Sequence, residues 1–362
     1  MKYLHKFETQ SQCESYMNGS NYVEPFVGLV AETREISYNK PPHDYSQDYL
    51  TFNITSGGTI VWTANDTAFT KTISYSKDNG ATWTDITSTT AGTSFNVNAG
   101  DKVLFKGDND TYGSGTTGGI EYNSFGGFGL TAGGLTAGFE VEGNIMSLID
   151  STNFATATTL TSAYTFYGLF DGCTGLTTAE HLVLPATTLV EYCYGNMFKG
   201  CSLTSAPELP ATTLANMCYY NMFYGCTSLT TAPELPATTL AVNCYNCMFR
   251  YCQSLITAPE LPATTLANGC YFLMFCECES LTTAPELPAT TLSNSCYARM
   301  FENCFSLNYI KCLATDISAD YCTGDWVFHV ALSGTFVKNP NMSSWTTGDS
   351  GVPTGWTVQD AS

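Results

Sequence analysis

Residues 184–189 spell Leu-Pro-Ala-Thr-Thr-Leu, and the same hexapeptide begins again at Leu209, Leu235, Leu261 and Leu287. The intervals between these starts are 25, 26, 26 and 26 residues. The wider repeat is LPATTL-x-x-x-C-Y-x-x-M-F-x-x-C-x-S-L-T-T-A-P-E, and its first copy is one residue short after Cys201. Self-similarity at about 20–29 residues is typical of proteins built from stacked repeats. The sequence therefore predicts a solenoid whose repeats bury one another.

Each repeat offers apolar positions that only stacking can bury. They are Leu189/214/240/266/292, Met197/222/248/274/300, Phe198/223/249/275/301 and Leu203/229/255/281/307. The alternating stretch SLTTAPEL predicts a short strand that ends at the proline. The stretch CYxxMF spaces its apolar residues by three and four, which predicts one or two helical turns on the opposite side.

Twelve of the 16 cysteines follow the repeat rather than a pairing pattern. One column runs through Cys193, Cys218, Cys244, Cys270, Cys296 and Cys322, and the other through Cys173, Cys201, Cys226, Cys252, Cys278 and Cys304. A cysteine that recurs once per repeat behaves as a small buried hydrophobe, so we expect buried thiols. Some disulfides remain an alternative, whereas zinc lacks a second cysteine pair at metal-binding spacing.

The segments around the array differ in kind. Residues 48–106 hold strand-like runs separated by turns such as Asn-Gly and Ala-Gly, which predicts an antiparallel β-sandwich. A glycine-rich stretch follows, and residues 143–150 predict a short helix. The expected fold is mainly β with short helices: an N-terminal anchoring segment (1–47), a β-sandwich-like domain with Gly-rich loops (48–142), an N-terminal cap with a degenerate repeat (143–183), the array (184–312) and a C-terminal cap (313–362).

The pattern M-F-x-x-C-x-S-L-T-x-x-P-x-L-P-x-x-L over residues 155–322 resembles the BspA-like, treponemal-type leucine-rich repeat of bacteria. That resemblance implies a leucine-rich-repeat solenoid on a surface protein that binds host proteins or other cells. The opening segment and the closing stretch GTFVKNPNMSSWTTGDSGVPTGWTV resemble segments of structural or fibre proteins of gut phages. Those resemblances imply a virion protein.

Charge and hydropathy exclude several classes of partner. The chain has 32 acidic against 13 basic residues, a formal net charge of −19. Nucleic-acid binding needs a basic surface, so we expect no such partner. No stretch of about 18 apolar residues predicts a membrane span, and the N-terminus shows no signal peptide.

Motifs that suggest chemistry have simpler explanations here. LPATT lacks the glycine at which a sortase cuts LPxTG, so the motif belongs to the repeat. Ser76, Asp78, Gly80, Thr82 and Trp83 match the Asp-box of sialidases, but a single copy indicates a hairpin turn. The four histidines are scattered, and no nucleophile or P-loop motif is present. We expect no enzyme activity, no cofactor and no metal; the loop with Asp108 and Asp110 leaves calcium as a minor alternative.

Two sets of residues are candidates for binding. An acidic stripe is expected with carboxylates about 5 Å apart, formed by Glu208, Glu234, Glu260 and Glu286. These glutamates are either simply solvated, or they face a basic partner surface or bind cations. The other set lies at positions around Cys-Tyr and Met-Phe that differ from repeat to repeat, whereas the Thr-Thr-Ala-Pro-Glu segment of the same repeats hardly changes. Exposed tyrosine and arginine are preferred in recognition, although drift would look the same. The candidates are Tyr220, Tyr224, Arg250, Tyr251, Phe272 and Arg299.

These features predict a non-enzymatic virion structural or adhesion protein, such as a phage fibre, tail or capsid-decoration protein. Its N-terminal region would dock on a virion protein, and its repeats would bind a host-surface protein or glycan. The expected location is the virion, and self-association of the chain is left open. The alternative is a BspA-like adhesin on a bacterial cell surface, which would need an export signal.

Overall fold

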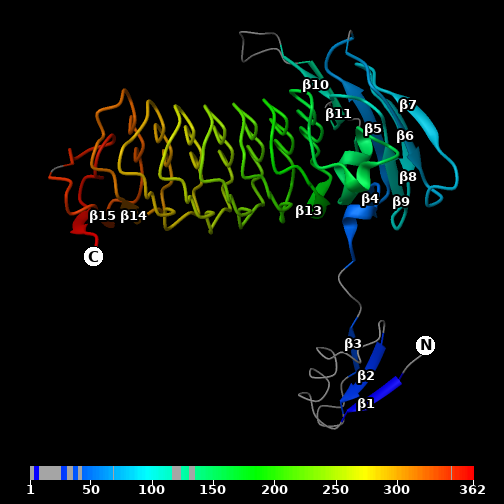
Figure 1. Ribbon diagram of the computed structural model, residues 1–362, viewed down its shortest axis with the longest axis horizontal. Helices are drawn as coiled ribbons and strands as arrows, with labels where there is room; N and C mark the ends of the chain where they lie inside the picture. The colour runs from blue at the N-terminus through cyan, green and yellow to red at the C-terminus, as the bar shows by residue number, and fades with distance from the viewer. Residues whose placement is uncertain are drawn as a thin grey trace. The chain divides into compact units, whose positions relative to one another are not determined.

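The computed structural model describes residues 43–362, except 68, 116–123, 130–134 and 344, and the backbone of three strands nearer the N-terminus. The fold is mainly β and consists of several sheets (Figure 1). Helix is confined, in this part of the chain, to the 3-10 helices η1 (Tyr45–Gln47), η2 (Ile145–Leu148) and η3 (Phe154–Thr156). The chain divides into two compact units, Met1–Tyr45 and Ser46–Ser362.

The first unit contains one small sheet. Strand β2 (Phe26–Val30) lies between β1 (Leu4–Phe7), to which it is parallel, and β3 (Ile36–Asn39), to which it is antiparallel. The side chains of these strands, and Cys13, fall outside the described residues. The anchoring role predicted for residues 1–47 therefore stays a prediction.

The second unit begins with two sheets. The larger has the order β13-β12-β4-β9-β6-β7 and the smaller the order β10-β11-β5-β8. All of these pairs are antiparallel, as predicted for residues 48–106, except the parallel pair of β12 and β13. The strands are β4 (Leu50–Ser56), β5 (Gly58–Ala64), β6 (Thr72–Ser76), β7 (Thr84–Thr87), β8 (Thr93–Val97), β9 (Lys102–Lys106), β10 (Gly113–Ser114), β11 (Ser124–Phe128), β12 (Gly138–Asn144) and β13 (Leu176–Val183).

Aromatic side chains from both sheets meet in one core. Phe128 on β11 lies 4.8 Å from Phe52 on β4 and 5.0 Å from Phe105 on β9, measured between ring centroids. Trp62 on β5 lies 4.8 Å from the same Phe128 ring. All four rings are fully buried. Aromatic pairs at such distances contribute stabilising free energy beyond that of burying their surface area. The cluster therefore holds the two sheets together.

The helix predicted within residues 143–150 is present as η2. Asn144 caps it, because its side-chain oxygen accepts a hydrogen bond from the Met146 N–H at 3.0 Å. The buried Ser147 hydroxyl accepts from the Leu50 N–H at 3.0 Å and donates to the Phe105 carbonyl at 3.1 Å. These bonds tie the segment before the repeats to strands β4 and β9.

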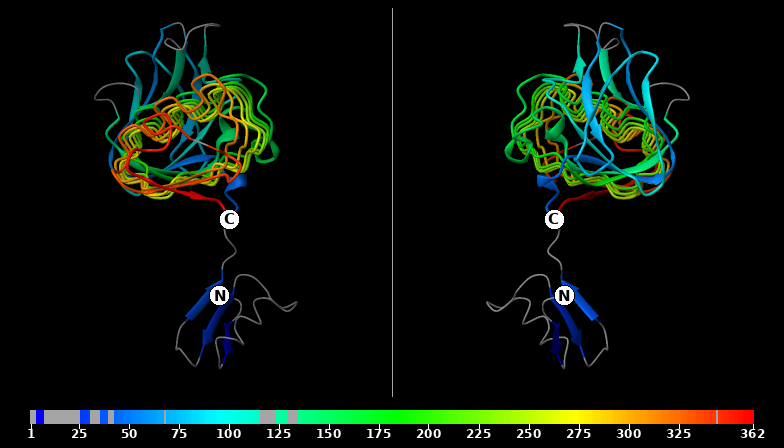
Figure 2. Two further views of the ribbon diagram at one scale, coloured as in Figure 1. Left: turned by 90° about the vertical axis from the view of Figure 1, so that its left-hand side faces the viewer. Right: turned by 90° about the vertical axis from the view of Figure 1, so that its right-hand side faces the viewer.

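The repeats follow as a row of loops that lie side by side (Figures 1 and 2). Single parallel bridges join Thr188, Thr213, Thr239 and Thr265 in sequence. The predicted strand SLTTAPEL is likewise shortened to isolated bridges, such as that between Thr231 and Thr257. The proline in each APELP segment lacks an N–H, so longer pairing is interrupted there.

The helical turns predicted for CYxxMF are wrong. In this segment every second backbone N–H donates to a carbonyl within its own repeat, as Met197 does to Tyr194 at 3.3 Å. The other N–H groups donate to a carbonyl of the next repeat, as Tyr194 does to Cys218 at 3.0 Å. The result is a string of turns. Every fourth residue has a positive φ, for example Tyr192 at 54° and Asn196 at 54°. A helix would use all of these donors internally and would leave neighbouring repeats unbonded.

Behind the turns, identical side chains stack. Tyr194, Tyr219, Tyr245, Tyr271 and Tyr297 form a buried column with ring centroids 5.7–6.0 Å apart. Phe170 of the degenerate copy continues the phenylalanine column, 5.4 Å from Phe198. The fifteen described cysteines are all buried and free, which confirms the expectation of buried thiols.

The C-terminal segment continues the row instead of only covering it. Strands β14 (Tyr309–Cys312), β15 (Thr335–Lys338) and β16 (Thr357–Asp360) pair in parallel. Trp326 lies over the end of the tyrosine column, 6.2 Å from Tyr297, and its indole N–H donates to the Gly351 carbonyl at 2.8 Å. The larger indole replaces the methionine of earlier repeats and closes the apolar core.

Candidate functional site

Four positions in the string of turns change from repeat to repeat, and we call them the outer columns. Residues at the same position lie in adjacent repeats, because the Gly225 N–H bonds to the Arg250 carbonyl and the Tyr251 N–H to the Cys276 carbonyl. The first column holds Tyr220, Asn246, Phe272 and Ala298; the second Asn221, Cys247, Leu273 and Arg299; the third Lys199, Tyr224, Arg250, Cys276 and Glu302; the fourth Gly225, Tyr251, Glu277 and Asn303.

All six residues predicted for binding lie in these columns. Five of them come from three consecutive repeats, and Arg299 lies in the repeat that follows these three. Sequence reasoning missed Lys199, although aligning the repeats one copy further back would have placed it in line with Tyr224 and Arg250. It also missed Asp325 and His329, which continue the columns beyond the array.

A cationic and aromatic cluster occupies the middle of the third column. The Tyr224 ring has Lys199 Nζ at 6.0 Å on one neighbouring repeat and the Arg250 guanidinium at 5.9 Å on the other. Arg250 also lies 4.9 Å from the Tyr251 ring centroid. Cations near aromatic faces are attracted by the ring quadrupole. We refer to Lys199, Tyr224, Arg250 and Tyr251 as the basic-aromatic patch.

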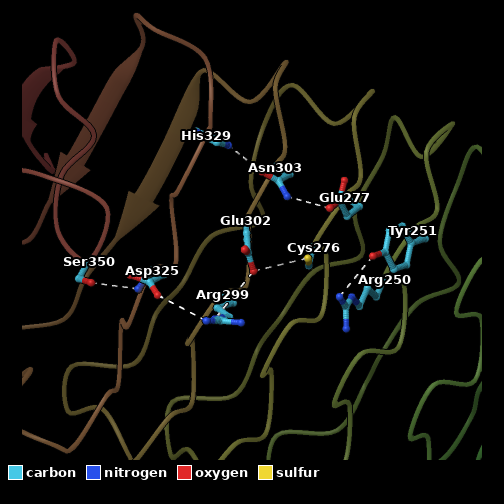
Figure 3. Close-up of polar contacts among 10 residues, drawn as sticks. All are labelled: Arg250, Tyr251, Cys276, Glu277, Arg299, Glu302, Asn303, Asp325, His329 and Ser350. Carbon is cyan, nitrogen blue, oxygen red and sulfur yellow. Dashed lines mark hydrogen bonds and ion pairs between the residues drawn. The ribbon is translucent and has the colours of Figure 1, made fainter.

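Polar contacts take over in the following repeats (Figure 3). Asn303 donates from Nδ2 to Glu277 Oε1 at 2.7 Å, and its Oδ1 accepts from His329 Nδ1, 3.0 Å away, in the tautomer protonated there. Arg299 lies 3.9 Å from Glu302 and 3.8 Å from Asp325. Each of these contacts, except that between Arg299 and Glu302, joins adjacent repeats. Carboxylates outnumber cations on this half of the face, because Arg299 stands against Glu277, Glu302 and Asp325.

Two thiols pack between these regions. Cys247 and Cys276 form a small apolar cluster with Leu273, separate from the main core. Burial raises the pKa of Cys247 to about 11 and that of Cys276 to about 12. Both thiols are therefore protonated at neutral pH. A protonated thiol is a poor nucleophile and a poor metal ligand, so these residues act as packing groups.

The residues of the predicted acidic stripe are all exposed at equivalent sites of successive repeats: Glu208, Glu234, Glu260 and Glu286. Lys311 takes the next position and pairs with Glu286 at 2.9 Å. A shallow pocket of about 360 Å³ lies at the start of the stripe; its lining includes Pro207, Glu208, Pro233 and Glu234.

The Asp-box forms the hairpin turn between β6 and β7. Asp78 accepts from the Thr82 N–H at 2.9 Å and from the Thr82 hydroxyl at 2.6 Å, and Gly80 has a φ of 85°. The hydrogen bonds from Thr82 are the main cause that lowers the pKa of Asp78 to about 2. Trp83 packs under Lys106, whose Nζ is 4.3 Å from the ring. The motif has the local geometry of a turn.

The loop that was considered for calcium binding uses Asp108 for hydrogen bonds within the protein. Asp108 accepts from the Ser151 N–H at 2.8 Å and from the Ser151 hydroxyl at 3.0 Å. Within the described residues, no group of three or more His, Cys, Asp or Glu side chains could hold a metal ion. The same residues contain no helix long and apolar enough to cross a bilayer.

No model of a protein family matches this chain, and no curated protein or solved structure matches it either. The basic-aromatic patch can attract anionic and ring-shaped groups, while the neighbouring half of the face offers hydrogen bonds. This combination is suited to binding.

Proposed function

We propose that this chain is a non-enzymatic adhesion protein of a phage particle, acting as a fibre, tail or capsid-decoration protein. Its N-terminal region docks on the virion, and the outer columns bind a host-surface protein or glycan. The finer architecture proposed with it is a β-sandwich in residues 48–142 and a leucine-rich-repeat solenoid with flanking caps. The meeting of aromatic side chains from two sheets and the stacked repeats support that architecture.

The observation that carries the binding role is a contrast within each repeat. Buried columns and the Thr, Pro and Glu positions repeat the same residue, whereas the outer columns combine Tyr, Arg, Phe and Asn. A stack of bonded repeats holds those side chains on a common face. Tyrosine and arginine contribute large contact areas at modest entropic cost, which makes such a face effective in recognition.

The virion assignment rests on the resemblance of both ends of the chain to phage structural proteins. The resemblance of the repeats alone favours the second candidate, an adhesin on a bacterial cell surface. Both candidates use the outer columns for adhesion, so they differ in where the protein is attached.

The location can be tested by mass spectrometry of purified phage particles beside washed surface fractions of the host. Recovery in particles at fixed stoichiometry is expected, and recovery only on cells would exclude the virion assignment. Adhesion is tested with the full chain on host cells. A variant with Tyr220, Tyr224 and Tyr251 changed to Ser should lose binding, whereas a variant with Thr212, Thr238 and Thr264 changed to Ser should keep it.

A further inference from the structure

Arg250 differs from the other basic side chains of residues 143–362. This segment has five lysine and arginine residues. Among the described residues, Arg250 is the one of the five that has no carboxylate within 4.0 Å of its side-chain nitrogens. The other four are paired: Lys199 with Asp171 at 3.9 Å, Arg299 with Glu302 and Asp325, Lys311 with Glu286, and Lys338 with Asp360. A lone cation is unexpected in a chain with 32 acidic residues. Its counter-ion has to come from outside these residues.

The protein nevertheless holds Arg250 in place. Its Nη2 donates a long hydrogen bond of 3.4 Å to the Tyr251 hydroxyl, and both Tyr224 and Tyr251 flank the guanidinium. Its Nε is buried and has no hydrogen-bond partner among the described residues. Because Nε is buried, an incoming oxyanion would instead meet the terminal Nη1 and Nη2 groups of this partly exposed side chain. A guanidinium fork matches the two oxygens of a carboxylate in geometry.

Lys199 extends the same arrangement. It approaches the Tyr224 ring at 6.0 Å from the repeat opposite to Arg250, so the two cations are two repeats apart, roughly 10 Å at strand spacing. Its own carboxylate partner is distant, at 3.9 Å. The tyrosine ring between two cations provides an apolar contact with a charge on either side.

We propose that the basic-aromatic patch binds a carboxylate-bearing glycan, with Arg250 gripping a sugar carboxylate and the tyrosine rings contacting the sugar. This inference rests on the proposed function and specifies its ligand. A peptide is less well matched, because the backbone donors here are already used: the N–H groups of Tyr224, Gly225 and Arg250 all bond within the stack. Strand addition, a common mode of peptide binding, is therefore blocked at this face.

The test measures binding of the full chain to oligogalacturonate, to its methyl ester and to poly-L-glutamate by calorimetry at low salt. The free acid should bind and the ester should not. Arg250→Gln should raise the Kd about tenfold or more, as expected for a lost hydrogen bond to a charged group. Lys338→Gln, which changes net charge equally at a distant ion pair, should leave the Kd unchanged. Thermal melting of both variants checks that they fold.

The outcomes separate this inference from adhesion itself. Equal binding of the acid and the ester, or no effect of Arg250→Gln, would show that the patch does not recognise the carboxylate. Equal binding of poly-L-glutamate would identify an acidic-peptide site instead. If the chain adheres to host cells but binds none of the three probes, the glycan inference fails while the proposed function stands. If it binds neither cells nor probes, both fail.

Discussion

The backbone N–H of Phe198 donates a hydrogen bond of 2.9 Å to the carbonyl of Met222, the residue that precedes its counterpart Phe223 in the next repeat. The amide of Met197, one residue earlier, turns back to Tyr194 in its own repeat. This alternation allows one segment both to bend and to bond to its neighbour. It also forces every fourth residue into the left-handed region of φ, whichever side chain it carries.

The left-handed positions should tolerate asparagine far better than a β-branched residue. At Gly225, with φ at 72°, an added Cβ would come no closer than 3.9 Å to its neighbours, so only the backbone resists substitution. Gly225→Val should lower the free energy of unfolding by about 1–2 kcal/mol or more, and Gly225→Asn by much less. Urea unfolding of both variants measures the difference. Equal losses would contradict the backbone explanation.

Asp171 should make the protein less stable at neutral than at mildly acidic pH. Burial raises its pKa to about 6, against the partly compensating charge of Lys199. A carboxyl whose pKa is raised by folding contributes stability at low pH, and that contribution is lost as the pH rises through about 6. Asp171→Asn should therefore stabilise the protein at pH 8, by up to about 3 kcal/mol, and change little at pH 4.

Asp316 provides a control of opposite sign for this titration. Its carboxylate accepts hydrogen bonds from the hydroxyl and the N–H of Ser318, which lower its pKa. Asp316→Asn should destabilise the protein above the ordinary carboxyl pKa, with the difference vanishing as the pH falls further. Melting temperatures between about pH 2.5 and pH 8 test both variants. If both variants were more stable than the unmodified protein at neutral pH, the opposite pKa shifts of Asp171 and Asp316 would not explain the stability changes.

The buried thiols should resist alkylation while the protein is folded. Burial raises the pKa of Cys201, Cys226 and the other column cysteines, and the thiolate is the reactive form. Iodoacetamide at pH 8 should leave fifteen thiols unmodified in the native protein, and guanidinium should expose them all. Intact-mass spectrometry counts the added groups. Rapid native labelling of Cys247 or Cys276 would show that the smaller cluster opens.

The acidic stripe should weaken the stack only at low salt. Neighbouring carboxylates about 5 Å apart repel by roughly 0.8 kcal/mol per pair in water, and salt screens this repulsion. Glu260→Gln should raise the melting temperature in dilute buffer and have a much smaller effect in 0.5 M salt, where the Debye length of about 4 Å is close to the repeat spacing. Glu286→Gln should give no gain, since it removes the 2.9 Å ion pair with Lys311.

The sequence predicts the core of the repeats well and their backbone poorly. Recurrence of Cys, Phe and Leu at one period identifies the buried columns, because only stacking buries them. The conformation of the turns is less visible, since the spacing of Tyr219, Met222 and Phe223 fits a helix as well as a string of turns. No propensity marks Leu273 or Arg299 as left-handed; neighbouring repeats impose it on them.

The candidate site was found in part for the same reason. Variation between repeats pointed to Tyr224, Arg250 and Tyr251, which the structure brings together. The missing partner of Arg250 and the approach of Lys199 depend on which positions align between repeats. That alignment is set by the hydrogen bonds between repeats, which cannot be read from the sequence of a single repeat.

The bridges that join Thr188, Thr213, Thr239 and Thr265 link near-identical segments in identical surroundings. A folding chain can therefore pair a given LPATTL with the wrong copy at almost no loss of local energy. The choice among these registers is left to the unequal ends of the row, namely β13 on one side and Trp326 on the other. Folding should accordingly be slowest where the repeats are most alike, and two chains that exchange one repeat would be the expected misfolded product.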